Sequence, residues 1–411
     1  MYLQKHNAHL TYCSNIHPGE TWEDTLANIE TYTTKVMTEM GADRFGIGLR
    51  ISGEASKGLL EGDQLIDFKN WLEKKNLYVF TINGFPYGNF HSQRVKDHVH
   101  SPDWLSEERL AYSKRLFIIL NTLLPDGMDG GVSTSPISYR HWFSSEKELN
   151  KAKQTGAGQI ADLALFLHQL KQESGKSLHL DMEPEPDGIL ETGEEFIRYY
   201  NDFILPTGVE KLTEELNCTS EVAEAIIREH IQICFDVCHF AVGFEEIDTA
   251  LQNLKDEKIK VGRIQISAAL GTGKLSADSD YSLIKEELQT FDEPVYLHQA
   301  VCKNADGDSQ RFRDLGPALE VFEDLKPDEM RTHFHVPIFL EKYKTLVSTQ
   351  QAIKETLKYW KKEPFTPHLE VETYTWGILP EALQTDIVSS VCRELNWVKD
   401  TLDNYEQTGS N

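Results

Sequence analysis

The stretch IQICFDVCHF, residues 231–240, is a short apolar run in which one carboxylate, Asp236, stands past the middle. Bounded runs of this length that are rich in β-branched and aromatic residues are typical of buried strands. Seven similar runs occur along the chain, and segments with helical spacing of apolar residues separate them. They are HLTYC (9–13), RFGIGLRIS (44–52), LYVFTINGF (77–85), SLHLDMEPEP (177–186), GRIQIS (262–267), HFHVPIF (333–339) and HLEVETYTW (368–376).

Strands that alternate with helices predict an α/β protein with a parallel sheet. A count of eight favours a closed (β/α)₈ TIM barrel over an open doubly wound sheet. The residues between the third and fourth runs are mainly helical in pattern, with a loop at 125–136. We expect a single TIM-barrel domain at 1–405 with helical and loop insertions, an insertion at about 271–330, and a C-terminal tail at 406–411.

Composition excludes several classes of protein. The 411 residues carry 41 Lys and Arg against 66 Asp and Glu, a net charge of −25, which disfavours a nucleic-acid partner. The six cysteines are sparse and lack zinc-ribbon spacing, so we expect free thiols in a reducing compartment. Neither a signal-peptide pattern nor an apolar stretch of about 18 residues is present, which predicts a cytoplasmic protein without a transmembrane segment.

Polar residues recur inside the predicted strands. Side chains alternate across a strand, so one set faces the barrel axis. A polar residue then falls on the inner face of every strand, and these residues are His9, Arg50, Asn83, Glu183, Asp236, Gln265, His335 and Glu372. A barrel interior built for stability alone is filled with Val, Ile and Leu. We therefore expect these polar side chains to bind one another, a metal or a substrate at the carboxyl ends of the strands.

Three of these residues, Glu183, Asp236 and Glu372, are carboxylates that would repel one another if they converged. A divalent cation removes that repulsion, and the amide oxygen of Gln265 completes an oxygen-rich set. Such a set suits Mn²⁺ or Mg²⁺, with Co²⁺ or Zn²⁺ as alternatives if His239 or His335 joins it. The competing interpretations are a solvated acidic loop at Glu183 and a salt bridge within the barrel at Glu372.

The segment Asp236-Val-Cys-His239 resembles the Asp-x-x-His motif of the xylose isomerase-like TIM-barrel superfamily. That superfamily includes sugar isomerases, sugar epimerases and endonuclease IV-type enzymes. Glu183 and Glu372 match the two glutamates of its metal site. Its epimerases usually place a metal-binding histidine on the sixth strand, where this chain has Gln265.

A closer resemblance is to the EboE-like proteins, a group of metabolite traffic or sugar isomerase/epimerase-like proteins. The matching segments spread over nearly the whole chain, and they are HLTYCSNIHPGETW (9–22), NGFPYGNFH (83–91), VKDHVHSPDW (95–104), DMEPEPDG (181–188), FDVCHFAVGFEE (235–246), IQISAAL (264–270) and LEVETYTW (369–376). This resemblance implies a xylose isomerase-like fold, a metal site and a role in a bacterial metabolite gene cluster.

The superfamily resemblance implies an isomerase or epimerase that acts on a sugar- or polyol-like metabolite by metal-assisted proton transfer. Glu183 and Glu372 would be its catalytic residues. The metal ligands would be Glu183, Asp236, Gln265 and Glu372. From strand register we expect substrate contacts at His9, Arg50, Asn83 and His335, with His239 from the Asp-x-x-His segment and His91 from a segment that could cover the barrel mouth.

Two other functions remain open at this point. The barrel could bind and hand on a metabolite, such as a prenylated precursor, beside protein partners of its pathway and without catalysis. Endonuclease IV-type phosphodiester hydrolysis is the third, but it would need three zinc ions and more histidine ligands, and the negative charge opposes DNA binding.

Overall fold

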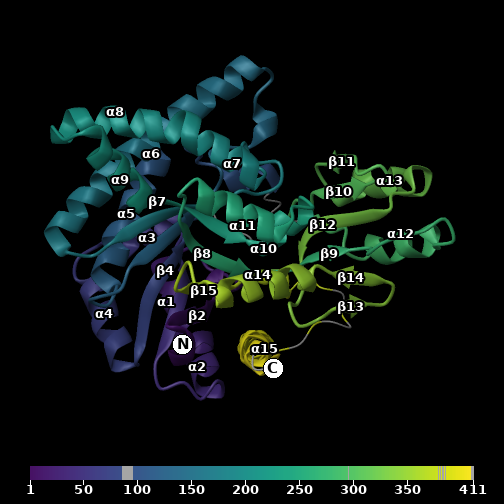
Figure 1. Cartoon of the computed structure of the whole chain (residues 1–411). Helices are drawn as coiled ribbons and strands as arrows, with labels where there is room; N and C mark the ends of the chain where they lie inside the picture. The colour runs from purple at the N-terminus through teal and green to yellow at the C-terminus, as the bar shows by residue number, and fades with distance from the viewer. Residues whose placement is uncertain are drawn as a thin grey trace.

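A barrel of parallel strands forms the body of the protein (Figure 1). This computed structural model describes residues 1–85, 96–294, 296–377, 379, 381, 384 and 386–408. Within them, a nine-stranded sheet runs in the order β1-β2-β15-β8-β7-β6-β5-β4-β3, with β1 antiparallel to β2 and the other neighbours parallel. The strands are β1 (Tyr2–Leu3), β2 (Ala8–Tyr12), β3 (Phe45–Arg50), β4 (Leu77–Asn83), β5 (Gly130–Thr134), β6 (Leu178–Met182), β7 (Ile231–Asp236), β8 (Val261–Ile266) and β15 (His368–Val371).

Helices connect successive strands and cover the outside of the barrel (Figure 1). They are α1 (Trp22–Asn28) and α2 (Thr34–Glu39) after β2, α3 (Gly53–Gly58) and α4 (Gln64–Lys74) after β3, α5 (Glu107–Leu123) after β4, α6 (Glu146–Ser174) after β5, α7 (Gly193–Tyr199), α8 (Leu205–Leu216) and α9 (Ser220–His230) after β6, α10 (Val237–Val242) and α11 (Ile247–Asp256) after β7, α14 (Gln350–Lys362) before β15, and α15 (Ile387–Thr408) after it. In the described ranges, none of these helices is long and apolar enough to cross a membrane.

Side chains complete the barrel where β2 meets β3. The two strands share one parallel bridge, between Cys13 and Gly48. The Thr11 hydroxyl replaces ladder hydrogen bonds there, because it donates to the Gly46 carbonyl at 2.7 Å and accepts from the Gly48 amide at 3.0 Å. These bonds satisfy buried backbone groups that would otherwise lack partners at the seam.

A second, antiparallel sheet follows β8 and lies beside the barrel (Figure 1). Its order is β11-β10-β12-β9-β14-β13, and α12 (Tyr281–Gln289) and α13 (Leu315–Leu325) accompany it. The strands are β9 (Ala269–Gly271), β10 (Ala300–Lys303), β11 (Ser309–Phe312), β12 (Glu329–His335), β13 (Lys342–Tyr343) and β14 (Leu346–Ser348). The single-domain division at 1–405 stays a prediction, and α15 runs into the expected tail.

The predicted TIM-barrel fold is confirmed, but its strand count of eight came from two errors that cancel. The run at 333–339 is not a barrel strand, because β12 belongs to the second sheet. The loop expected at 125–136 contains a barrel strand, β5, which starts Gly130-Gly131 and lacks an apolar run. Gly131 is required there, since a Cβ atom at that position would lie 2.1 Å from Asp181 Oδ2.

A buried ion network fills the barrel axis. The guanidinium of Arg263 donates to Glu370 Oε2 at 2.6 Å and to Asp181 Oδ2 at 3.3 Å. It also donates to the backbone carbonyl of Ile82 at 2.8 Å. The side chains of Arg263 and Asp181 are fully buried, and that of Glu370 is 1% exposed. A charge removed from water to this extent needs such partners.

The axial carboxylates depend on glycines in the facing strands. A Cβ atom on Gly48 would lie 1.9 Å from Glu370 Oε1 and 2.5 Å from the Tyr12 carbonyl oxygen. We expect Gly48→Ala to lower the free energy of unfolding by about 1–3 kcal/mol through overpacking. Gly158, in α6, has open space around its Cα, so Gly158→Ala is expected to raise the same quantity by about 0.5–1 kcal/mol. Urea denaturation of the two variants checks this, and equal effects would contradict it.

Candidate metal centre

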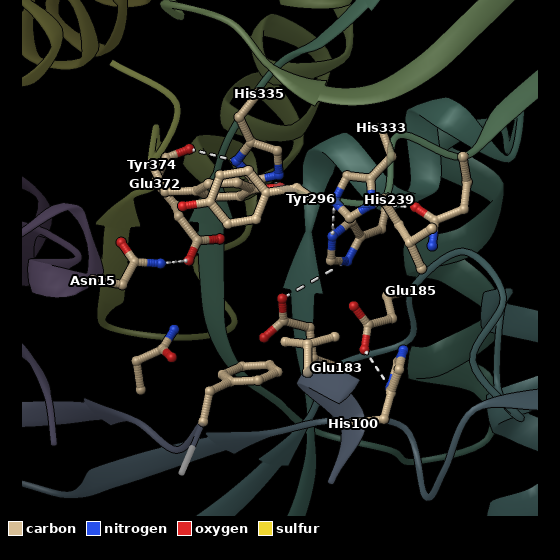
Figure 2. A pocket seen from close by; sticks show the side chains of 15 residues that line it. Asn15, His100, Glu183, Glu185, His239, Tyr296, His333, His335, Glu372 and Tyr374 are labelled. Carbon is tan, nitrogen blue, oxygen red and sulfur yellow. Dashed lines mark hydrogen bonds and ion pairs between the residues drawn. The ribbon is translucent and has the colours of Figure 1, made fainter. Parts of the chain in front are cut away.

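A pocket of about 110 Å³ lies at the carboxyl ends of the barrel strands (Figure 2). Both sheets line it, with residues that follow barrel strands on one side and residues of the second sheet on the other. The lining residues are Asn15, Asn83, Phe85, Val99, His100, Glu183, Glu185, His239, Tyr296, Leu297, Gln299, His333, His335, Glu372 and Tyr374. Catalytic residues of TIM-barrel enzymes are found at this end of the barrel.

Three carboxylates converge at this end of the barrel, and two of them, Glu183 and Glu372, line the pocket. Glu183 directly follows β6, Asp236 ends β7, and Glu372 directly follows β15. One carboxylate oxygen from each lies within 4.8 Å of the other two, and all three residues are buried. The sequence therefore predicted a set of carboxylates that the fold does bring together.

Asp236 and Glu183 each keep one oxygen without a hydrogen bond. Asp236 Oδ1 caps α10 by accepting from the His239 amide at 3.1 Å, and it accepts from the Ser267 hydroxyl at 2.7 Å. Asp236 Oδ2 and Glu183 Oε2 are buried and accept no hydrogen bond from the described residues, although His239 Nε2 lies 4.0 Å from Asp236 Oδ2. A buried carboxylate oxygen without a donor is costly, and a bound cation would satisfy it.

Glu372 differs from Glu183 because side-chain amides hold both of its oxygens. Asn15 Nδ2 donates to Glu372 Oε1 at 2.6 Å, and Gln265 Nε2 donates to Glu372 Oε2 (Figure 2 shows the first contact). Gln265 Oε1, the oxygen predicted to bind metal, accepts from the Cys234 thiol. In this arrangement Gln265 orients Glu372.

The carboxylates raise one another's proton affinity. Burial, together with the charges of Glu372 and Asp236, raises the pKa of Glu183 well above its ordinary value. Burial and the charges of Asp236 and Glu370 raise the pKa of Glu372 in the same direction. Three adjacent carboxylates with two unpartnered oxygens fit a divalent cation, which would neutralise them and occupy the free lone pairs.

Imidazole rings form the opposite wall of the pocket. His239 lies on α10, and His333 and His335 lie on β12 of the second sheet. Burial lowers the pKa of all three, that of His335 to about 4, so the rings are neutral at pH 7. A further pair, His100 and Glu185, faces the pocket with 3.4 Å between His100 Nδ1 and Glu185 Oε1 (Figure 2).

Two residues predicted to contact substrate do not reach this pocket. His9 lies near the amino end of β2, where its Nδ1 contacts the Tyr78 hydroxyl at 2.7 Å, and it lines a separate cavity. The expectation that it stands at the carboxyl end was wrong, because it is the second residue of its strand. Arg50 ends β3, but its guanidinium donates to the Gly19 carbonyl at 2.9 Å and lies 3.5 Å from Glu20 Oε1.

The remaining predicted contacts divide in two groups. Asn83, His239 and His335 line the pocket, and Asn83 Nδ2 is buried without a partner among the described residues. His91 lies outside the described residues.

Several lining residues were missed as candidates in the sequence. Asn15 follows β2 in a short 3₁₀ turn, and no motif marks it. Tyr296 and Gln299 lie in the inserted segment, whose packing on the barrel mouth has no local sequence pattern. Tyr374 was within reach of inference, since it stands two residues after Glu372 in the eighth predicted strand.

No protein-family model matches the sequence, and a search of curated proteins finds no match. Solved structures are similar to it at low identity. The IolI protein with a zinc atom is 13% identical, with 97% of this chain and 99% of that chain covered and a TM-score of 0.44. A D-tagatose 3-epimerase-like protein is 8% identical over 98% and 100%, with a TM-score of 0.49. A xylose isomerase-like TIM-barrel protein from Mycobacterium smegmatis in complex with magnesium is 11% identical over 97% and 98%, also at 0.49.

The carboxylate cluster predicts that one of its members destabilises the metal-free protein. The pKa of Glu183 is higher in the folded chain than its ordinary 4.5, so the folded state holds a proton that the unfolded state releases. The contribution of Glu183 to wild-type stability therefore falls as pH rises above about 4.5. We expect Glu183→Gln, which cannot ionise, to be more stable than wild type at pH 8 by about 0.5–2 kcal/mol, with a smaller gain at pH 5.

Urea denaturation in the presence of a chelator measures this difference. The matched control is Glu195→Gln, which removes the negative charge that lies 2.6 Å from Arg140 Nη2 and should lower stability. Added Mn²⁺ should then stabilise wild type more than Glu183→Gln. A Glu183→Gln variant that is less stable than wild type without metal would contradict the prediction.

Proposed function

We propose that this protein is a divalent-metal-dependent isomerase- or epimerase-like enzyme that acts on a sugar- or polyol-like metabolite by proton transfer. The observation that carries the proposal is the pair of buried glutamates, Glu183 and Glu372, which converge with Asp236. One glutamate has a free oxygen and the other is fixed by amide donors. Two carboxylates in different environments are the usual basis for dividing acid and base roles.

Glu183, Asp236 and Glu372 would hold the cation. Gln265 could be a fourth ligand only if its side-chain amide rotated so that Oε1 no longer accepts from the Cys234 thiol. When bound, a divalent cation polarises substrate oxygens and acidifies the neighbouring C–H bond. The oxygen-rich set favours Mn²⁺ or Mg²⁺.

The roles of the two glutamates follow from their hydrogen bonds. Among the described residues Glu183 Oε2 accepts no hydrogen bond, and Glu183 Oε1 lies 3.7 Å from His239 Nδ1, so one oxygen can bind the cation while the other takes a proton from the substrate carbon. Glu372 exchanges a proton from the other side and must release one amide contact, from Asn15 or Gln265, to do so. Asn83 Nδ2 is buried and has no partner in the part of the chain that the structure describes, so it is available to a substrate hydroxyl.

The alternative is a protein that binds and hands on a metabolite without converting it, as the EboE-like resemblance implies. The apolar part of the pocket favours this alternative, because it could hold the hydrocarbon part of a prenylated precursor. It consists of Phe85, Val99, Leu297 and the rings of Tyr296 and Tyr374.

Solvent exchange separates the two functions. Metal-loaded wild type is incubated in deuterated water with a panel of sugars and polyols, and NMR follows deuterium incorporation at carbon. We expect exchange with at least one compound, and a loss of about 100-fold or more in Glu183→Gln. Glu195→Gln, a glutamate outside the pocket lining, should exchange like wild type. If the metal-loaded wild type exchanges none of the compounds while it binds one of them, the binding function replaces the enzymatic one.

A further inference from the structure

One glutamate of the pocket lies outside the carboxylate cluster that fits a cation. Glu185 lines the pocket, but among the described residues it belongs to none of the groups of converging metal-ligand atoms. Its Oε1 atom is buried and accepts no hydrogen bond from those residues. A buried carboxylate oxygen without a donor is costly, so this atom indicates an interaction that a ligand would complete.

His100 stands beside Glu185 and presents a second buried polar atom. Its side chain is 2% exposed, and its Nδ1 lies 3.4 Å from Glu185 Oε1 without a hydrogen bond to any described residue. The imidazole packs against Tyr139, at 5.2 Å between ring centroids, and against Trp142, at 6.5 Å. Glu185 and His100 therefore bring two unsatisfied atoms together at one wall of the pocket (Figure 2).

The backbone fixes the position of Glu185. Proline stands on both sides of it, at 184 and 186, and restricts the backbone torsions of this segment. The Glu185 amide donates to the Leu190 carbonyl at 3.2 Å, and the Glu185 carbonyl accepts from the Gly188 amide at 3.1 Å. A turn with little freedom thus presents this carboxylate to the pocket.

Glu185 lacks a positive side chain in contact with it among the described residues. The described lining of the pocket holds three glutamates and neither lysine nor arginine. The charge of Arg109 acts on Glu185, but its guanidinium donates to two backbone carbonyls and to the Ser135 hydroxyl. Burial, together with the charge of Asp236, raises the pKa of Glu185 to about 8. A cationic group of a ligand at Glu185 would oppose both effects.

The other unsatisfied atoms of the lining are mostly acceptors. Asn15 Oδ1 and Glu183 Oε2 are buried without a hydrogen bond from the described residues, whereas Asn83 Nδ2 is a donor in the same condition. A phosphate or carboxylate group offers acceptors and a negative charge, so it would meet groups of its own kind here. Hydroxyl and ammonium groups can donate, and an ammonium also supplies the positive charge that Glu185 lacks.

We propose that Glu185 and His100 form a subsite for a protonated amino group, so that the pocket takes an amine-bearing sugar or polyol in preference to a phosphorylated or carboxylated one. The ammonium donates to Glu185 Oε1 and, in the tautomer with the proton on Nε2, to His100 Nδ1. The subsite rests on the proposed function in that a sugar- or polyol-like ligand enters this pocket. It applies equally to the enzyme and to the binding alternative.

Four sugars that differ only at C6 test this charge preference. D-glucose carries a hydroxyl group there, 6-amino-6-deoxy-D-glucose an ammonium, D-glucuronate a carboxylate and D-glucose 6-phosphate a phosphate. Titration calorimetry with Mn²⁺-loaded wild type measures the Kd of each sugar. We expect the amino sugar to bind about 10-fold tighter than glucose, because a charge-assisted hydrogen bond is stronger than a neutral one. Both anionic sugars should bind more weakly than glucose.

Variants assign the preference to Glu185. Glu185→Gln keeps the size of the side chain and removes its charge, so the amino sugar should lose its advantage over glucose. Glu185→Asp keeps the charge on a shorter side chain and should retain part of the advantage. Glu195→Gln, outside the pocket lining, is the matched control and should bind the four sugars like wild type.

Two results would overturn the subsite. One is an amino sugar that binds wild type no better than glucose, or does not bind at all. The other is an advantage that survives in Glu185→Gln, as it would if the amine bound the metal instead.

Deuterium exchange, measured separately, keeps this proposal distinct from the proposed function. An amine preference that depends on Glu185, without exchange of any sugar, would leave the subsite standing and favour the binding protein. Exchange without an amine preference would remove the subsite alone.

Discussion

Arg263 constrains the whole barrel. A guanidinium with no exposure to solvent is tolerated only if its donors are matched, and four strands supply the acceptors. These are Asp181 on β6, Glu370 on β15, and backbone carbonyls of β4 and β5. Each acceptor fixes the position of its strand around the axis. Breaking such a buried network typically costs about 3–5 kcal/mol, so these strands cannot shift independently.

Three of the residues at the candidate site stand on or directly after barrel strands that carry the axial network, nearer to the carboxyl ends of those strands. Glu183, Gln265 and Glu372 each stand two residues after a member of the axial network, namely Asp181, Arg263 and Glu370. Two residues along a strand return the side chain to the same face about 6.6 Å further on. In the lower layer Arg263 pairs with both acids, and His179 Nδ1 also contacts Asp181 Oδ1 at 2.5 Å. In the upper layer glutamine stands where the arginine would be, and Asp236 adds a third acid, so the charge there is left for a ligand to balance.

The sequence predicted the upper layer better than the barrel that holds it. The alternation of side chains along a strand shows which carboxylates face the barrel axis near the strand ends. This pattern predicted that Glu183, Asp236 and Glu372 lie close together, as they do in the structure. The sequence did not reveal β5, because this strand lacks the apolar run that marks the other strands. Glycine is required at position 131, where the Asp181 carboxylate of the neighbouring strand leaves no space for a side chain. His333 and His335 have strand alternation, but nothing local distinguishes a parallel barrel strand from an antiparallel one in an insertion. The role of Asn15 could not be predicted, because it rests on a hydrogen bond to Glu372, which is far away in the sequence.

The second sheet changes what the barrel mouth can bind. The barrel strands contribute oxygen atoms, and their geometry is locked by Arg263 below. The nitrogen atoms come mainly from β12, which is anchored separately, through contacts such as that of Gln299 with the Pro186 carbonyl and that of Arg311, on β11, with Glu191. The oxygen donors therefore lie on the barrel, and most of the nitrogen donors lie on the second sheet. Ligand atoms from both lie close to Asp236. The two units are coupled at this point, because His335 Nδ1 donates to the Glu372 carbonyl at 2.9 Å and the Thr375 hydroxyl donates to the His335 carbonyl. A substitution in the sheet that moves His335 therefore also bears on the carboxylate that follows β15.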